Sequence, residues 1–152
     1  MDGAHDFDFL HGSWRVANRQ LRERLTGSDD WREFGATLHV RPVLGGLGNI
    51  DSFQVDGESF EGMTLRLFDL DARRWRIHWA DTRRGALDPP LSGTFANGTG
   101  TFYGDDAHEG RPVRVRFIWQ SIDADTARWE QAFSTDGGRT WEVNWIMDFK
   151  RM

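Results

Sequence analysis

The stretch Trp129-Glu-Gln-Ala-Phe-Ser-Thr-Asp-Gly-Gly-Arg-Thr-Trp-Glu-Val-Asn-Trp-Ile-Met-Asp-Phe-Lys-Arg151 decides the fold. Two runs rich in aromatic and β-branched residues flank Asp136-Gly137-Gly138, where glycine permits positive φ and the chain can reverse. In the second run, one set of alternate residues is Trp141, Val143, Trp145, Met147, Phe149 and Arg151, and the other contains Glu142, Asn144, Asp148 and Lys150. A period of two predicts a β-hairpin with one face in the core and the other in water.

The same alternation recurs along the chain and predicts an all-β protein. Turn residues separate the apolar runs every ~8 to 12 residues, a spacing typical of a sandwich or barrel. We expect a single antiparallel β-barrel of about ten strands, with residues 1–152 as one domain. The predicted strands before the hairpin are residues 14–25, 31–43, 48–55, 60–70, 75–81, 91–95, 100–103 and 113–120. An interruption near Gly35 predicts a β-bulge that lets its strand bend.

A short N-terminal segment is the one predicted exception to the β pattern. Residues 6–11 are Asp-Phe-Asp-Phe-Leu-His, which predicts one helical turn capped by Asp6. Phe7, Phe9 and Leu10 would then form an apolar plug at one end of the barrel.

Composition excludes several classes of protein. The chain has no cysteine, so it has no disulfide, thiol nucleophile or cysteine-based metal site. Its net charge is -5 and its arginines are scattered, which argues against nucleic-acid binding. Residues 1–8 carry acids where a secretory signal needs positive charge, and no apolar stretch reaches the ~20 residues of a membrane span. We therefore expect a cytoplasmic protein that binds no membrane. The five histidines share no ligand spacing, so no metal site is predicted.

Eight tryptophans predict either a densely filled interior or an aromatic-lined pocket. If Trp14, Trp79, Trp119, Phe133 and Trp145 point inward, alternation turns six polar residues inward as well: Asn18, Gln20, Asn49, Asp51, Asp81 and Gln131. A buried polar group without a partner costs ~1 to 3 kcal/mol, so a dry core would exclude them, whereas a ligand pocket uses such groups. The candidate ligand-binding residues are these six with Trp79, Trp119 and Trp145. The alternative, that some lie in water at strand ends or bond to one another and to backbone, stays open.

Other polar residues are assigned to the outer wall. His78 should face outward, paired with Arg66 across the turn at residues 69–74. Glu130 and Asn144 should face each other outside the barrel, beside arginines of the preceding strand, in a solvated salt-bridge ladder.

Both ends of the chain resemble a known family. Gly12, Ser13 and Trp14 on the first strand, with Arg151 able to pack on that Trp from the last strand, resemble the signature of lipocalin and calycin barrels. The run Phe7-Asp-Phe-Leu-His-Gly-Ser-Trp14 is similar to an uncharacterised family of bacterial calycin-like proteins of unknown function. The resemblance implies a calycin-like barrel with Gly12, Trp14 and Arg151 as its structural signature.

Comparison with members of that superfamily narrows the kind of barrel that we expect. Secreted lipocalins carry a signal peptide and usually a disulfide, whereas fatty-acid-binding proteins have a helical lid for which residues 27–30 leave no room. A lidless intracellular barrel like that of the nitrobindin family is the most similar shape. That family binds haem through a histidine near the C-terminus, and no histidine follows His108 here, so no cofactor is expected.

Three hypotheses of function follow. The first is an intracellular binding protein that holds a small hydrophobic or aromatic ligand inside a Trp-lined barrel, with no catalytic residue. The second is an enzyme that uses the same barrel with inward Asp51 or Asp81 as general base. The third is a homodimeric interaction module with a face of exposed aromatic residues.

Overall fold

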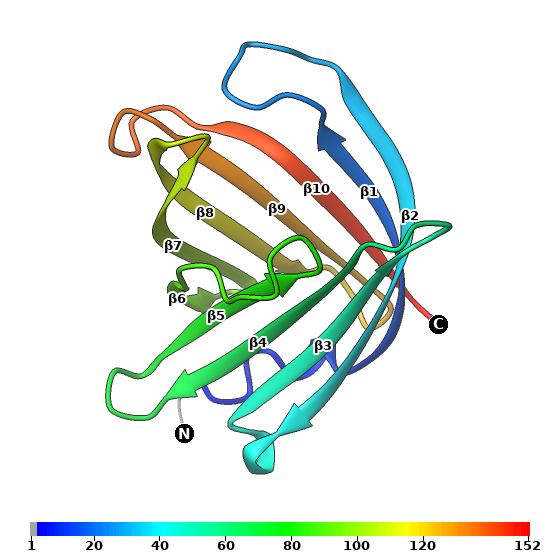
Figure 1. Cartoon of the computed structure of the whole chain (residues 1–152). Helices are drawn as coiled ribbons and strands as arrows, with labels where there is room; N and C mark the ends of the chain where they lie inside the picture. Colours follow the sequence, from blue (N-terminus) through cyan, green and yellow to red (C-terminus); the bar gives the residue numbers. More distant parts are fainter. Residues whose placement is uncertain (1–2) are drawn as a thin grey trace.

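The computed structural model describes residues 3–152 and shows a closed antiparallel β-barrel (Figure 1). Within this range the ten strands are β1 (Gly12–Leu21), β2 (Trp31–Val43), β3 (Gly48–Val55), β4 (Glu61–Asp69), β5 (Arg74–Asp81), β6 (Leu91–Ala96), β7 (Thr99–His108), β8 (Arg111–Ser121), β9 (Thr126–Ser134) and β10 (Glu142–Arg151). Each strand pairs with its neighbours in the chain, and β1 pairs with β10 to close the barrel. Every strand therefore has a neighbour on both sides, although β5 and β6 pair only through residues 75–77 of β5. The predicted fold class is confirmed.

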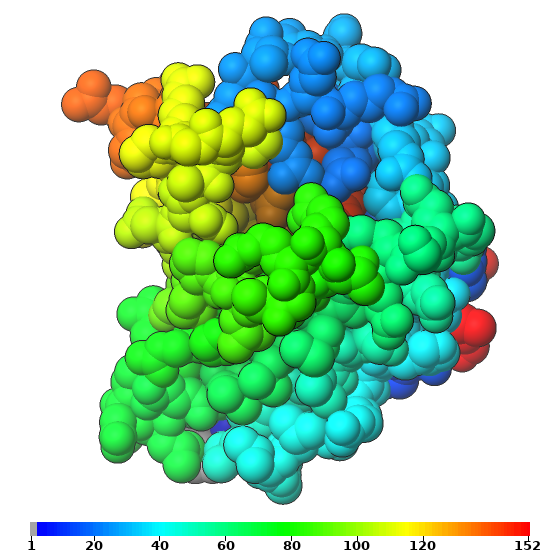
Figure 2. Space-filling view, viewed as in Figure 1, coloured from blue at the N-terminus to red at the C-terminus, as the bar shows by residue number. Residues whose placement is uncertain are grey.

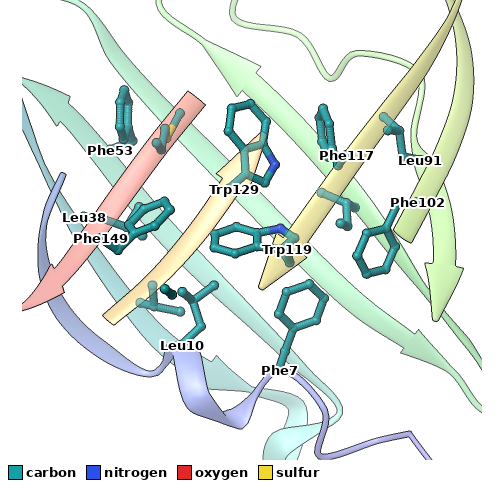
Figure 3. Close-up of a cluster of buried hydrophobic side chains, with 14 of the residues drawn as sticks. Phe7, Leu10, Leu38, Phe53, Leu91, Phe102, Phe117, Trp119, Trp129 and Phe149 are labelled. Carbon is teal, nitrogen blue, oxygen red and sulfur yellow. The ribbon is translucent and has the colours of Figure 1, made fainter. Parts of the chain in front are cut away.

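The N-terminal plug closes one end of the barrel. A 3-10 turn, η1 (Asp8–Leu10), follows Phe7, and the ring of Phe7 is 1% exposed. Figure 3 shows Phe7 and Leu10 reaching from this segment toward the aromatic residues inside the barrel. Phe7 packs edge-on against Trp75 and Trp119, with ring centroids 4.9 and 6.0 Å away. The predicted cap is wrong: no side chain caps this turn, and Phe7 rather than Asp6 precedes it.

Arg151 ties the plug to the barrel wall. Its guanidinium donates to the carbonyl oxygens of Phe9 and His11, each at 2.7 Å, and its Cζ lies 4.1 Å from the centre of the Trp14 ring. Trp14 Nε1 donates to Leu10 O at 2.9 Å. Gly12 has φ of +113°, and a Cβ there would lie 2.9 Å from Arg151 Nη1. Glycine is therefore required at this position for both its backbone conformation and its size.

The bulge predicted near Gly35 is absent, because pairing between β1 and β2 continues without a shift through Ala17 and Gly35. Gly35 instead leaves space outside the barrel for the ion pair of Arg15 and Asp56, whose nitrogen and oxygen lie 2.6 Å apart. A Cβ on Gly35 would lie 2.7 Å from Arg15 Nη2 and 2.5 Å from Asp56 Oδ2.

The irregular pairing lies in β10, where the register with β9 shifts between Val143 and Trp145. The shift places Asn144 at 0% exposure, so its predicted position on the outer wall is wrong. Glu130 consequently pairs with Ile146 instead of Asn144. A bulge reverses the faces that strict alternation assigns on one side of it, which accounts for the error.

The face assigned to Arg66 is also wrong. Thr64, Arg66 and Phe68 point into the barrel, and Arg66 is 3% exposed. His78 opposes Leu65 rather than Arg66. Leu65 is half-buried on the outer wall.

No helix in residues 3–152 has the length and apolar character needed to cross a membrane.

Candidate functional site

The barrel encloses a cavity of about 930 Å³. It opens between three segments of chain: residues 22–26 after β1, residues 83–89 between β5 and β6, and residues 106–109 at the β7–β8 turn. Figure 2 shows this mouth as a hollow rimmed by blue, green and yellow segments, with orange atoms of the later strands visible in its depth. The plug lies at the other end, because Phe7 packs against Trp119 on the cavity floor.

Aromatic side chains make up much of the cavity wall. Trp145 stands edge-on to Trp79 and Trp129, with ring centroids 6.2 and 5.5 Å apart. Phe53 packs edge-on against both Trp79 and Trp145. These side chains hold one another in orientations favourable for aromatic pairs, so the wall is already shaped before any ligand enters. Gly62 makes room for Trp79, because a Cβ on Gly62 would lie 2.1 Å from Trp79 Cη2.

A buried ion pair lies among these rings. Arg66 Nη2 is 2.7 Å from Asp51 Oδ2, and Arg66 Nη1 donates to Asn49 Oδ1 at 2.8 Å. Asp51 Oδ1 accepts the backbone N–H of Thr64 at 2.9 Å. Burial raises the pKa of the Asp51 carboxyl, while Arg66 and Thr64 oppose the rise. The guanidinium also faces the Trp119 ring, with Cζ 5.4 Å from its centre.

Two donors beside this pair lack partners. Among the described residues, no acceptor is hydrogen-bonded to Arg66 Nε or to Asn49 Nδ2, and both atoms are buried. Native proteins satisfy nearly all buried polar groups with protein atoms, water or ligand, so unpaired donors need an explanation. A molecule that carries a hydrogen-bond acceptor could supply the missing partner, as could water.

Six of the nine candidate binding residues line the cavity: Gln20, Asp51, Trp79, Trp119, Gln131 and Trp145. Two others are buried against them. Asn18 Oδ1 accepts the indole N–H of Trp145 at 3.0 Å, and Asn49 accepts from Arg66. The amide of Gln131 donates to Asn144 Oδ1 at 2.8 Å. Part of the predicted polar set therefore bonds to other protein groups, and the bond from the Thr64 backbone to Asp51 matches the alternative, left open by the sequence, that some of these residues bond to backbone.

Asp81, the ninth candidate, is not part of the cavity wall. It lines a separate groove of about 710 Å³ that includes residues from the outer face of β2, β3 and β4. Its carboxylate accepts the indole N–H of Trp79 at 2.9 Å and pairs with Arg83 at 2.7 Å. Burial raises the pKa of Asp81, but hydrogen bonds from Arg83 and Trp79 outweigh it and lower the value to about 2.

The two carboxylates are thus held by different arginines, and this bears on the enzyme hypothesis. A general base must be free to take a proton near the operating pH. The pKa of the Asp81 carboxyl is lowered to about 2, and Asp51 is ion-paired with Arg66 through Oδ2 and accepts the Thr64 N–H through Oδ1. Across residues 3–152 no cluster of three or more His, Asp or Glu side chains could hold a metal ion.

The interaction-module hypothesis needs a face of exposed aromatic residues. In residues 3–152 the exposed aromatic residue is Tyr103, at 39%, and its ring lies beside Trp141 and Arg114. Trp141 itself was predicted inside the barrel, yet it precedes β10 and packs under Arg116.

Arg66 is the functional candidate that sequence reasoning missed. A signal was present in the β4–β5 hairpin, where Phe68 pairs with Trp75. Directly opposed residues share a face of the sheet, so an inward Trp75 requires inward Phe68, Arg66 and Thr64.

The fold and the site together define a closed ten-stranded antiparallel β-barrel with an internal cavity. No protein-family model matches the chain, and no curated protein sequence does. Among solved structures it is similar to an S-type phycobiliprotein lyase from Guillardia theta, at 12% identity and a TM-score of 0.65, over 96% of this chain and 90% of the other. That likeness shows a shared fold. A protein of unknown function from the DUF3598 family of Nostoc punctiforme aligns over 100% of both chains, but at 9% identity and a TM-score of 0.29.

Proposed function

We propose that this chain binds a small hydrophobic or aromatic molecule inside the barrel. The observation that carries the proposal is the cavity of about 930 Å³, which opens to solvent and is lined by Trp79, Trp119, Trp129 and Trp145. Cavities of about 300 to 1,000 Å³ with apolar walls and a few polar groups are typical of small-molecule sites. A cytoplasmic setting is part of the same proposal, since a cysteine-free chain suits a reducing compartment.

The buried polar groups beside the cavity favour an aromatic ligand that carries a hydrogen-bond acceptor. Arg66 Nε and Asn49 Nδ2 are buried donors without partners among the described residues. Of these two residues Arg66 lines the cavity, so a ligand carbonyl or ring nitrogen placed beside Trp119 would lie near Arg66 Nε. Such a contact gives orientation, while most of the binding free energy comes from apolar area removed from water.

The test uses N-phenyl-1-naphthylamine, a neutral aromatic probe whose emission rises in apolar surroundings. Titration should give saturable emission and quench the tryptophan fluorescence of the protein. An open-chain tetrapyrrole such as biliverdin is a second probe, on account of the phycobiliprotein lyase with the same fold.

A matched pair of variants on β8 locates the binding. Val115→Trp places a large side chain in the cavity, which Val115 lines, whereas Ile118→Trp adds the same side chain on the half-buried outer face. We expect Val115→Trp to weaken probe binding at least about tenfold and Ile118→Trp to change it less than about twofold. Near-ultraviolet circular dichroism checks that both variants fold. Equal affinity of Val115→Trp and wild type, or no saturable binding of any probe, would contradict the proposal.

A further inference from the structure

Charged residues of both signs line the mouth of the cavity, including the acids Glu23, Asp106 and Glu109, which form no ion pair among the described residues. Five arginines line the mouth: Arg22, Arg24, Arg32, Arg83 and Arg84. Four of them are neutralised by their own carboxylates: Arg22 by Asp30 at 3.4 Å, Arg32 by Glu58 at 2.5 Å, Arg83 by Asp81 at 2.7 Å and Arg84 by Asp88 at 3.1 Å. Arg24 is the exception, because it forms no ion pair with any carboxylate of residues 3–152.

The surroundings of Arg24 hold its guanidinium against the cavity wall. Its Cζ lies 5.4 Å from the centre of the Phe133 ring, and Phe133 is 8% exposed and lines the cavity. A guanidinium stacked on an aromatic ring keeps its N–H groups free at the edges. Arg24 therefore presents several donors to whatever occupies the mouth.

Neighbouring charges leave Arg24 incompletely neutralised. Glu142 is the acid that acts on it, but Glu142 Oε1 already accepts the backbone N–H of Leu25 at 2.7 Å. Burial lowers the pKa of Arg24, the positive charge of Arg83 lowers it further, and Glu142 opposes both. A half-buried cation beside a second cation is costly unless an anion joins it.

We propose that Arg24 binds an anionic group of the ligand, so that the ligand class is an anionic aromatic or apolar molecule with a carboxylate, sulfonate or phosphate at the mouth. The inference rests on the proposed function and specifies its ligand. The planar fork of arginine matches two oxygens of such a group. The apolar body of the ligand would lie deeper, against Trp129 and Trp145, and the charged end would remain near water.

Two probes that differ by one anionic group test the inference. They are 8-anilinonaphthalene-1-sulfonate and N-phenyl-1-naphthylamine, which share the same aromatic framework and differ in the sulfonate. Replacing Arg24 by Gln should weaken binding of the sulfonate probe about tenfold, because a charge-assisted hydrogen bond is lost. The neutral probe should change less than about twofold. Arg24→Lys should recover part of the affinity for the sulfonate.

Arg19→Gln is the matched control. Arg19 stacks on Trp31 at 5.0 Å and faces Glu33 on the outer wall, so this variant removes the same charge and the same kind of stacking outside the cavity. Its affinity for both probes should remain within about twofold of wild type.

The inference is overturned if Arg24→Gln binds the sulfonate as tightly as wild type, if both probes weaken equally, or if Arg19→Gln weakens the sulfonate as much as Arg24→Gln does. Wild-type protein that binds neither probe overturns the proposed function and the inference with it. A third outcome is that wild-type protein binds the neutral probe and Val115→Trp weakens this binding, but Arg24→Gln does not selectively weaken binding of the sulfonate probe. That outcome overturns the inference and leaves the proposed function standing.

Discussion

Asp51 and Arg66 form an ion pair inside the barrel, with Oδ2 and Nη2 2.7 Å apart and side chains 1% and 3% exposed. Asp51 comes from β3 and Arg66 from β4, where Asn49 directly opposes Arg66 and Thr64 opposes Asp51. The pair is therefore set by strand register. Removing two charges from water is costly, and the pair persists because each partner offsets the other.

Removing one member of this pair should destabilise the protein strongly. Arg66→Met leaves the Asp51 carboxylate buried without its cation, and we expect the free energy of unfolding to fall by about 3 to 5 kcal/mol. The double variant Asp51→Leu/Arg66→Met removes both charges and should recover most of that loss. Guanidinium denaturation at pH 7, followed by tryptophan fluorescence, measures both. A double variant less stable than either single variant would contradict this account.

Substitution of Gly12 should lower the free energy of unfolding for a reason that does not apply to Gly27. Gly12→Ala places a Cβ 2.9 Å from Arg151 Nη1 at φ of +113°. Gly27 has φ of +77° and open space around its Cα, so Gly27→Ala carries the backbone penalty alone, about 1 kcal/mol. Gly12→Ala should lose at least about 2 kcal/mol. Equal midpoints of thermal unfolding for the two variants would show that Arg151 does not restrict this position.

The bulge at Asn144 should depend on its side chain. Asn144→Ala removes the acceptor for the Gln131 amide at a position that is fully buried, since Asn144 is 0% exposed. We expect a loss of about 1 to 3 kcal/mol in unfolding free energy. Lys150→Ala on the exposed face of the same strand should change it by less than about 0.5 kcal/mol. Urea denaturation of both variants tests this, and similar small effects would argue that the bulge needs no side-chain support.

Asp81 should contribute a pH-dependent part of the stability. Its folded pKa of about 2 lies below the ordinary value of 3.8, so the contribution is fully present above about pH 4 and is lost as pH falls toward 2. Asp81→Asn should therefore be less stable than wild type at pH 7, with the difference shrinking between pH 4 and pH 3. Urea denaturation across this range measures the difference. A difference that stays constant or grows toward pH 3 would contradict the assignment.

Residue patterns within single segments of the sequence were enough to predict much of the barrel. Alternation in residues 12–20 and 145–151 predicted the inward faces that meet where β1 and β10 pair. The apolar residues of the N-terminal turn predicted the plug, because three large side chains in a short segment need a buried surface.

The wrong predictions concern residues whose position depends on a neighbouring strand. Asn144 was assigned outward because nothing within its own strand marks the register shift. Arg66 was assigned outward because it was expected to oppose the outward His78, whereas the register of β4 and β5 places Leu65 opposite His78. The buried position of Arg66 depends on an acid and an amide supplied by β3.

By itself the sequence determined the all-β barrel and the inward faces of most strands, since a period of two is a property of a single extended backbone. Tertiary structure alone decided which polar side chains meet, that a cavity of about 930 Å³ remains among the tryptophans, and that Arg24 at its mouth forms no ion pair within residues 3–152. Those features depend on the register between strands and on the positions of the loops, and no pattern within one strand specifies either.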